Sequence, residues 1–116
     1  MGNYFQKEIE CASADQIRAW QNERLVKQVK NIYDNVPYYR TRMQNKGLEP
    51  GDIKSIDDLH KLPFITKDDL RDAYPYGLLA RPLKDCVRMQ STSGTTGRRV
   101  VAFYTQHDLD LWEDCC

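Results

Sequence analysis

The sequence lacks any long hydrophobic run. No stretch of about 18 apolar residues occurs in its 116 positions, which excludes a membrane-spanning helix of ordinary length. An excess of one charge is also lacking, because 17 Lys and Arg residues are balanced by 17 Asp and Glu residues. This balance argues against a nucleic acid or a membrane surface as partner. The N-terminus resembles no signal peptide, so we expect the protein in the cytoplasm.

Closely spaced cysteine pairs are also missing. The four cysteines are Cys11, Cys86, Cys115 and Cys116, and none of them forms a C-x-x-C pair. Metal and redox sites in proteins commonly use such pairs. We therefore predict reduced thiols and no metal site built by this chain.

The first two-thirds of the chain has helical periodicity. Ser13 followed by Gln16 is a capping-box pattern that predicts the start of a helix. Pro37 ends this helix and begins a second one, which Gly47 stops. Apolar residues at helical spacing make one stripe along the first helix. The stripe comprises Ile17, Trp20, Leu25, Val26, Val29, Ile32 and Tyr33.

Two shorter helices are predicted further along. Ser55 starts one that reaches about His60, and Thr66 with Asp69 starts another that ends near Tyr74. The carboxylate pairs at 57–58 and 68–69 fall in first turns, where negative charge favours the positive end of the helix dipole.

Tyr38 and Tyr39 allow two interpretations. Buried tyrosines supply a large apolar area with a polar tip, so both residues can pack within the helical region. Alternatively, the two rings line a pocket for an aromatic acid. We favour the packing role.

The period changes from 3.6 to 2 near residue 86. Alternation predicts a strand at about 86–91, and the β-branched and aromatic run at 100–104 predicts a second strand. Thr105 with Asp108 predicts a following helix, within which the sequence ends. The fold class is therefore α/β, or α+β within these residues. One unit spans 1–116, with a helical leader at about 13–83 and a strand, loop, strand and helix start at 84–116.

The loop between the two predicted strands is rich in glycine, hydroxyl and arginine residues. Gly94 and Gly97 permit positive φ angles, and successive backbone amides in such turns form a concave nest for phosphate oxygens. Arg98 adds a guanidinium that can bind phosphate through two hydrogen bonds. The hydroxyl groups belong to Ser91, Thr92, Ser93, Thr95 and Thr96. On composition alone, a solvated hairpin turn is the favoured explanation of the loop, and phosphate binding is the alternative.

The order of these residues goes further than their composition. Thr-Ser-Gly-Thr-Thr-Gly followed by a basic residue resembles the signature loop of adenylate-forming enzymes. It differs from a Walker A loop, which needs G-x-x-x-x-G-K-[ST] before a helix. Flanking segments resemble phenylacetate–coenzyme A ligases from about residue 15 to the end. These segments are NVPYYR at 35–40, LPFITKDDLR at 62–71, YPYGL at 74–78 and YTQHDLDLW at 104–112.

The resemblance implies a two-step reaction with ATP, Mg²⁺ and coenzyme A. An aryl-acetic acid, phenylacetate as the family-level expectation, would form an acyl-adenylate and then a thioester. The resemblance implies contacts to the ATP phosphates from Thr92, Ser93, Gly94, Thr95, Thr96, Gly97 and Arg98. It also implies that the catalytic residues lie beyond residue 116, so the chain alone is expected to be inactive.

The resemblance has one departure at the loop. A Lys-Pro pair commonly follows the second glycine in the family, whereas Arg98 and Arg99 stand here. Arg98 keeps the charge, but Arg99 removes the stiffening proline, which leaves the loop geometry open.

Two classes of function therefore remain. The first is a truncated or separately encoded piece of the ligase. The second is a non-catalytic helical module that binds a partner protein or a phosphate-bearing ligand. A piece of a larger domain would expose apolar surface, so self-association or a homodimer is expected.

Overall fold

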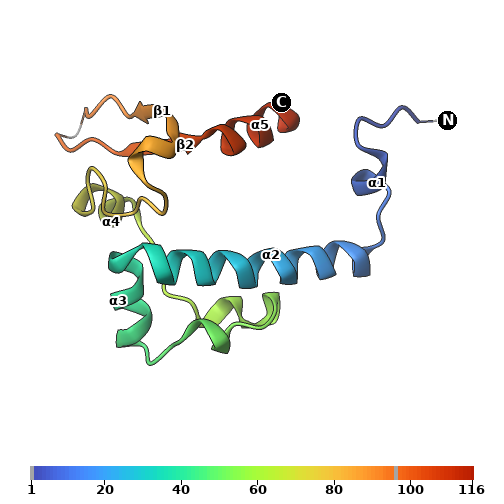
Figure 1. Ribbon diagram of the computed structural model, residues 1–116, viewed down its shortest axis with the longest axis horizontal. Coiled ribbons are helices and arrows are strands. Elements are labelled where there is room, and N and C mark those ends of the chain that lie inside the picture. The colour runs from blue at the N-terminus through green and yellow to red at the C-terminus, as the bar shows by residue number, and fades with distance from the viewer. Residues whose placement is uncertain (1, 96) are drawn as a thin grey trace.

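The computed structural model describes residues 2–95 and 97–116. A helical part, with the long helix α2 across it, lies beside a part formed by a β-hairpin and α5 (Figure 1). None of the helices in the described ranges is long and apolar enough to cross a membrane. The α-helices are α1 Lys7–Glu10, α2 Ala14–Asn35, α3 Pro37–Asn45, α4 Lys67–Asp72 and α5 Gln106–Cys115. The 3-10 helices are η1 Pro50–Asp52, η2 Ile56–Lys61 and η3 Leu83–Asp85, and the strands are β1 Cys86–Ser91 and β2 Val101–Thr105.

The predicted helix starts are confirmed by their capping hydrogen bonds. The Ser13 hydroxyl accepts the Gln16 N–H at 3.1 Å at the start of α2. Thr66 and Thr105 form capping boxes with the residues three positions later, at α4 and α5. Each box satisfies two backbone amides that would otherwise lack a partner. Local side-chain chemistry thus sets where these helices begin.

The core lies where α2 and α3 meet the segments that follow them. Its buried residues are Val29, Val36, Tyr39, Met43 and Ile53. The two packed helices meet at Val36, which ends α2 immediately before Pro37 begins α3. The side chains that pack against this core include Leu25, Ile32, Leu48, Leu62, Leu78 and Ala80.

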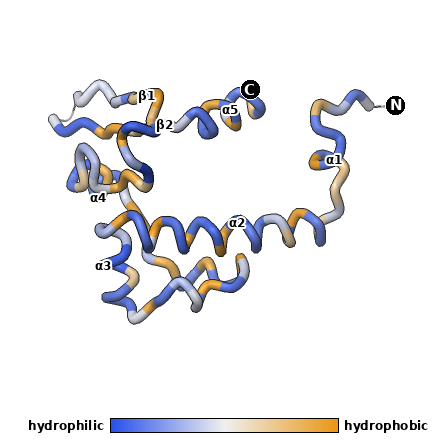
Figure 2. Tube along the Cα trace, in the orientation of Figure 1, coloured by the Kyte–Doolittle hydropathy of each residue, from blue (hydrophilic) through white to orange (hydrophobic). Residues whose placement is uncertain are grey.

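The apolar stripe predicted along α2 is most deeply buried near the C-terminal end of the helix. Hydrophobic and hydrophilic residues alternate along the whole helix (Figure 2). Val29 is 1% exposed, whereas Ile17 and Val26 are 38% and 40% exposed. Periodicity reports which residues share a face, but not whether another element covers that face. The predicted stripe therefore lies along α2, but it is covered unevenly.

Asp69 is the buried carboxylate that joins α3 to α4. It accepts hydrogen bonds from the Thr66 N–H at 2.7 Å, the Thr66 hydroxyl at 2.9 Å and the Tyr38 hydroxyl at 2.9 Å. It also forms an ion pair with Arg42. The backbone hydrogen bond from Thr66, followed by those from side chains, lowers the pKa of Asp69 to about 2. Asp69 is thus more than the helix-start residue that the sequence indicated.

The tyrosine pair packs as the favoured interpretation predicted. Tyr39 is 9% exposed and donates its hydroxyl hydrogen bond to the Pro63 carbonyl at 2.7 Å. Tyr38 donates to Asp69 and lies beneath the Arg42 guanidinium, 5.0 Å from the ring centroid. Both rings therefore hold the helical part together.

β1 and β2 form an antiparallel hairpin beside α4 (Figure 1). Met89 pairs with Phe103 and Ser91 with Val101, and the register is irregular between Cys86 and Arg88. The hairpin is anchored by aromatic contacts: Phe103 lies 5.5 Å from Tyr76, and Tyr104 lies 5.5 Å from Trp112, between ring centroids. The ring contacts join the strands to the segment after α4 and to α5.

The position of the core predicts that two methionine-to-alanine substitutions will lower the free energy of unfolding by very different amounts. Met43→Ala should lower the free energy of unfolding by about 2–3 kcal/mol, because Met43 is fully buried and its loss leaves a cavity. Met89→Ala is the matched control, since Met89 is 64% exposed. Urea denaturation measures both changes. Equal destabilisation by the two substitutions would contradict this location of the core.

Asp69 predicts a dependence of stability on pH. Its pKa is lowered from 3.8 to about 2 on folding, so its stabilising contribution is present above pH 4 and is lost as the pH falls towards 2. Asp69→Asn should lower the melting temperature by several degrees at pH 7 and flatten its fall between pH 5 and 2. The pKa of Asp58 is also lowered to about 2, so Asp58 adds a loss of stability at low pH both in the unmodified protein and in Asp69→Asn.

The neighbouring Asp68 supplies the control for this prediction. Asp68→Asn removes the same charge from the same helix turn, but the Asp68 side chain is 82% exposed. If the melting curves of Asp69→Asn and Asp68→Asn superimpose at every pH, the buried contacts of Asp69 do not add to stability, and the prediction is wrong.

Candidate functional site

The candidate site is the loop that joins the two strands. Its base is closed by two hydrogen bonds: the Thr92 N–H donates to the Val100 carbonyl at 3.0 Å, and the Val100 N–H donates to the Thr92 hydroxyl at 3.1 Å. Thr92 thus continues the ladder one position beyond β1, and its hydroxyl is an acceptor within the hairpin. The free part of the loop begins at Ser93.

Both loop glycines adopt the backbone conformation that the sequence predicted. Gly94 has a φ of 69° and Gly97 a φ of 96°, and the Gly97 N–H donates to the Gly94 carbonyl at 2.9 Å. Positive φ is costly for residues with a Cβ atom. The turn therefore depends on glycine at both positions.

Arg99 folds back against Gly94. A Cβ atom at Gly94 would lie 2.8 Å from the Arg99 Cγ, whereas one at Gly97 would meet nothing within 4 Å. The sequence left open how the loop leaves its turn without the family's proline. Here the Arg99 side chain covers the glycine.

The remaining predicted loop side chains face solvent. Ser93 and Thr95 are exposed, as is Arg98, while Thr96 lies outside the described residues. Exposed hydroxyl groups and a guanidinium are available to an anion, as a phosphate site requires. The loop brings the described residues among the seven predicted positions together, but phosphate binding by them stays a prediction.

A second element contributes to the surroundings of the loop. Arg98 donates from Nη1 to the Asp72 Oδ1 at 2.7 Å, which joins the loop to the last residue of α4. A hollow of about 630 Å³ lies between these elements. Its lining residues are Arg71, Asp72, Tyr74, Gly97, Arg98 and Arg99. The contribution of α4 could not be predicted from the sequence, because no local pattern shows which side chains a fold brings to a distant loop.

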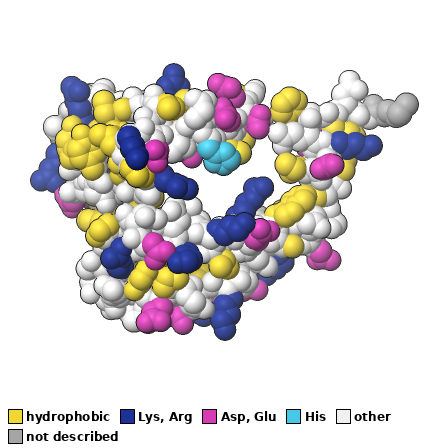
Figure 3. Space-filling model, viewed as in Figure 1, with side chains coloured by type: hydrophobic (Ala, Val, Ile, Leu, Met, Phe, Trp, Pro, Cys, Tyr) yellow, Lys and Arg dark blue, Asp and Glu magenta, His cyan; other side chains and the backbone are white. Residues whose placement is uncertain are grey.

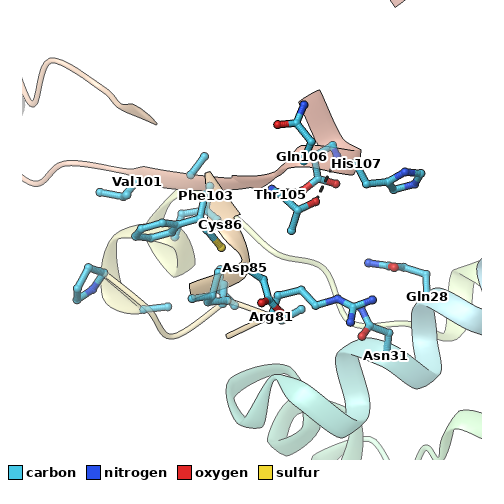
Figure 4. A pocket seen from close by; sticks show the side chains of 18 residues that line it. Gln28, Asn31, Arg81, Asp85, Cys86, Val101, Phe103, Thr105, Gln106 and His107 are labelled. Atoms are coloured by element: carbon cyan, nitrogen blue, oxygen red, sulfur yellow. Dashed lines mark hydrogen bonds between the residues drawn. The ribbon is translucent and has the colours of Figure 1, made fainter. Parts of the chain in front are cut away.

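A larger cavity of about 800 Å³ separates the hairpin from α2. The space-filling view shows the central opening between the two parts (Figure 3). Gln28 and Asn31 of α2 face it from one side, and Thr105 and His107 face it from the other (Figure 4). Among the described residues, no ion pair or hydrogen bond between α2 and α5 crosses this opening. The two parts are joined through α4 and residues 73–80.

Metal-binding groups are sparse in the described ranges. No cluster of three or more His, Cys, Asp or Glu side chains there is arranged to hold a metal ion. All four cysteines are free thiols, as the sequence indicated.

Proteins with similar sequences include several phenylacetate–coenzyme A ligases. The chain is 49% identical over 104 residues to a phenylacetate–coenzyme A ligase of Aromatoleum evansii, and 48% identical over the same length to one of Pseudomonas putida. It is 39% identical over 110 residues to the corresponding ligase of Thermus thermophilus. These matches cover 90–95% of this chain but only about 24–25% of each relative. No family model matches the chain.

Solved structures that resemble the fold of this chain include another coenzyme A ligase. A 2-hydroxyisobutyryl-CoA ligase in complex with 2-HIB-AMP and CoA superposes with a TM-score of 0.74 at 26% identity, over 83% of this chain and 21% of that one. A further structure of this ligase, in the postadenylation state, gives a TM-score of 0.79 over 90% of the chain. At 22% identity, the second likeness shows the fold alone.

The structural likenesses show that the chain has the fold of part of an adenylate-forming acyl-CoA ligase. The sequence matches narrow this class, because over 90–95% of its length the chain is similar to part of each of several phenylacetate–coenzyme A ligases. It spans about a quarter of the length of those relatives. The predicted order of a helical leader followed by the hairpin fits this family.

The geometry of the loop predicts unequal effects of two substitutions. Gly94→Ala should disturb the loop more than Gly97→Ala, because only Gly94 combines positive φ with a close contact to Arg99. The backbone strain of about 1–2 kcal/mol is common to both. Amide chemical shifts of Thr92 and Val100 report the disturbance at the loop base.

A second substitution isolates the steric part of this effect. Gly94→Ala combined with Arg99→Ala should shift the two amides less than Gly94→Ala alone. Gly51→Ala is the control, because Gly51 has neither positive φ nor a neighbour within 4 Å. Equal shifts with and without the Arg99 side chain would rule out its contact with Gly94.

Proposed function

We propose that this chain supplies the ATP-phosphate loop of an AMP-forming acid–coenzyme A ligase that activates an aryl-acetic acid. The observation that supports it is a loop with two positive-φ glycines and an exposed Arg98, in a chain 49% identical to a phenylacetate–coenzyme A ligase. Phenylacetate is the first candidate for the acid. The proposal assigns the phosphates to Thr92, Ser93, Gly94, Thr95, Thr96, Gly97 and Arg98.

The reaction would proceed in two balanced steps. A carboxylate oxygen of the acid attacks the α-phosphorus of ATP, the bond to the β-phosphate oxygen breaks, and an acyl-adenylate and pyrophosphate result. The thiol of coenzyme A then attacks the acyl carbon, AMP leaves, and a thioester forms. Charge on the leaving pyrophosphate must be neutralised during the first step.

The chain's own residues would act on that charge. Exposed hydroxyl groups of Ser93 and Thr95 donate hydrogen bonds to phosphate oxygens, and Arg98 supplies a planar guanidinium. Thr92 also fixes the loop base, since its hydroxyl accepts the Val100 N–H and keeps its own hydrogen to donate to a phosphate oxygen. Mg²⁺ would accompany ATP and add positive charge beside its phosphates.

The surroundings of the whole enzyme are part of the same proposal. The substrates are the aryl acid, ATP and coenzyme A, and the location is the cytoplasm. Catalytic residues would lie outside this chain. Self-association is also proposed, because large apolar side chains are exposed on the hairpin and beside α4; these include Val87, Met89, Tyr74 and Tyr76.

A chimera tests the proposed ligase activity. Residues 1–116 are joined to the region of the Aromatoleum evansii ligase that follows its matched segment, and pyrophosphate release is measured with ATP, coenzyme A and a panel of aryl acids. The chain alone should release none, whereas the chimera should turn over, fastest with phenylacetate. Arg98→Gln in the chimera should lower kcat/KM for ATP about 10- to 100-fold.

Arg24→Gln provides the control, because it removes the same charge from an exposed position on α2. A chimera that melts cooperatively yet releases no pyrophosphate with any acid of the panel would contradict the ligase assignment. Tight binding of ATP or of a partner protein by the isolated chain, seen by calorimetry, would then favour the non-catalytic module.

A further inference from the structure

The hollow between α4 and the loop is lined by several positively charged side chains and by one carboxylate. Arg71, Arg98 and Arg99 line it together with Asp72. Arg71 forms its own ion pair with Asp68 at 2.9 Å, and its side chain is 20% exposed. The Arg98 guanidinium is held at Nη1 by Asp72 at 2.7 Å. The same group that the proposed function assigns to phosphate therefore already has an anionic partner.

The contact between Arg98 and Asp72 is of a kind that exchanges readily. Their side chains are 70% and 57% exposed, and exposed ion pairs of this type contribute little to stability. A single N–H is committed to the carboxylate, whereas a guanidinium offers five in a fixed fork. A phosphate group presents more charge and more acceptor oxygens than a carboxylate, so it is the stronger ligand for that fork.

We propose that Asp72 is an affinity-determining residue that occupies Arg98 in the absence of nucleotide and competes with the ATP polyphosphate for it. Binding of the polyphosphate in the hollow replaces one N–H···O bond to the carboxylate with bonds to phosphate oxygens. The carboxylate stays at the edge of the hollow and repels the bound anion. The inference rests on the proposed function of the loop and names the α4 residue that sets its affinity.

If Asp72 competes with phosphate for Arg98, Asp72→Asn should strengthen phosphate binding. Loss of the negative charge removes the rival ligand of Arg98 and the repulsion of the anion, and both changes favour phosphate binding. A residue that merely positioned Arg98 would weaken binding on substitution. The amide of asparagine keeps the size of the side chain, so the hollow should retain its shape.

The test uses the 116-residue chain with inorganic tripolyphosphate and ATP as probes. Binding is measured by titration of the amide resonances of Gly94 and Gly97, and Kd is compared between variants. Asp72→Asn should tighten tripolyphosphate binding by about two- to fivefold. Arg98→Gln should weaken tripolyphosphate binding. When Arg98 is already replaced by Gln, adding Asp72→Asn should tighten binding much less than it does with Arg98 present.

Asp114→Asn is the matched control, because it removes one acidic charge from α5 at the opposite end of this part of the fold and should leave Kd unchanged (Figure 1). If Asp72→Asn leaves Kd unchanged or weakens binding while Arg98→Gln still weakens it, competition is overturned and the phosphate loop stands. If the unmodified chain shifts neither amide with either probe, both the loop assignment and the competition fail. An equal gain from Asp114→Asn would reduce the effect to net charge and also overturn the proposal.

Discussion

The arrangement of the molecule depends on the buried carboxylate of Asp69. Thr66 places this residue by the capping box at the start of α4, and Tyr38 and Arg42 reach it from α3. A buried charge without such partners would cost several kcal/mol, so each donor makes the position of the others more favourable. Because α4 is only six residues long, fixing its first turn also fixes its last. Asp72, which meets the loop, is therefore positioned by contacts made at the other end of the helix.

This connection links the core around α2 and α3 to the loop. Leu78 and Ala80 pack against the core, the tilted ring of Tyr76 contacts Phe103, and Asp72 binds Arg98. These contacts follow one another along residues 72–80, so they form a continuous bridge between the core and the hairpin. The central cavity separates the same two parts elsewhere (Figure 3). The orientation of the loop thus rests on a short segment whose own position depends on Asp69.

Local chemistry made much of the fold predictable. Helix starts at Ser13, Thr66 and Thr105 were readable because the cap and its partner lie three residues apart. The positive φ angles at the loop glycines followed from the absence of a Cβ atom. Long-range relations were not readable: the sequence placed Asp69 at a helix start but gave no sign of Arg42, 27 residues earlier. In the same way, the loop residues were identified by their order, while Asp72 is a neighbour only in space.

The state of the hairpin bears on how strongly the loop can hold an anion. All of β1 after Cys86 is exposed, and an isolated pair of strands is marginally stable in water. Two hydrogen bonds between Thr92 and Val100 close the loop, but no further strand supports them within the described ranges. Part of any binding energy must therefore order the strands before it appears as affinity. Phosphate binding by this chain should be weaker than the loop residues alone suggest, and additional packing on β1 would strengthen it without touching the ligand.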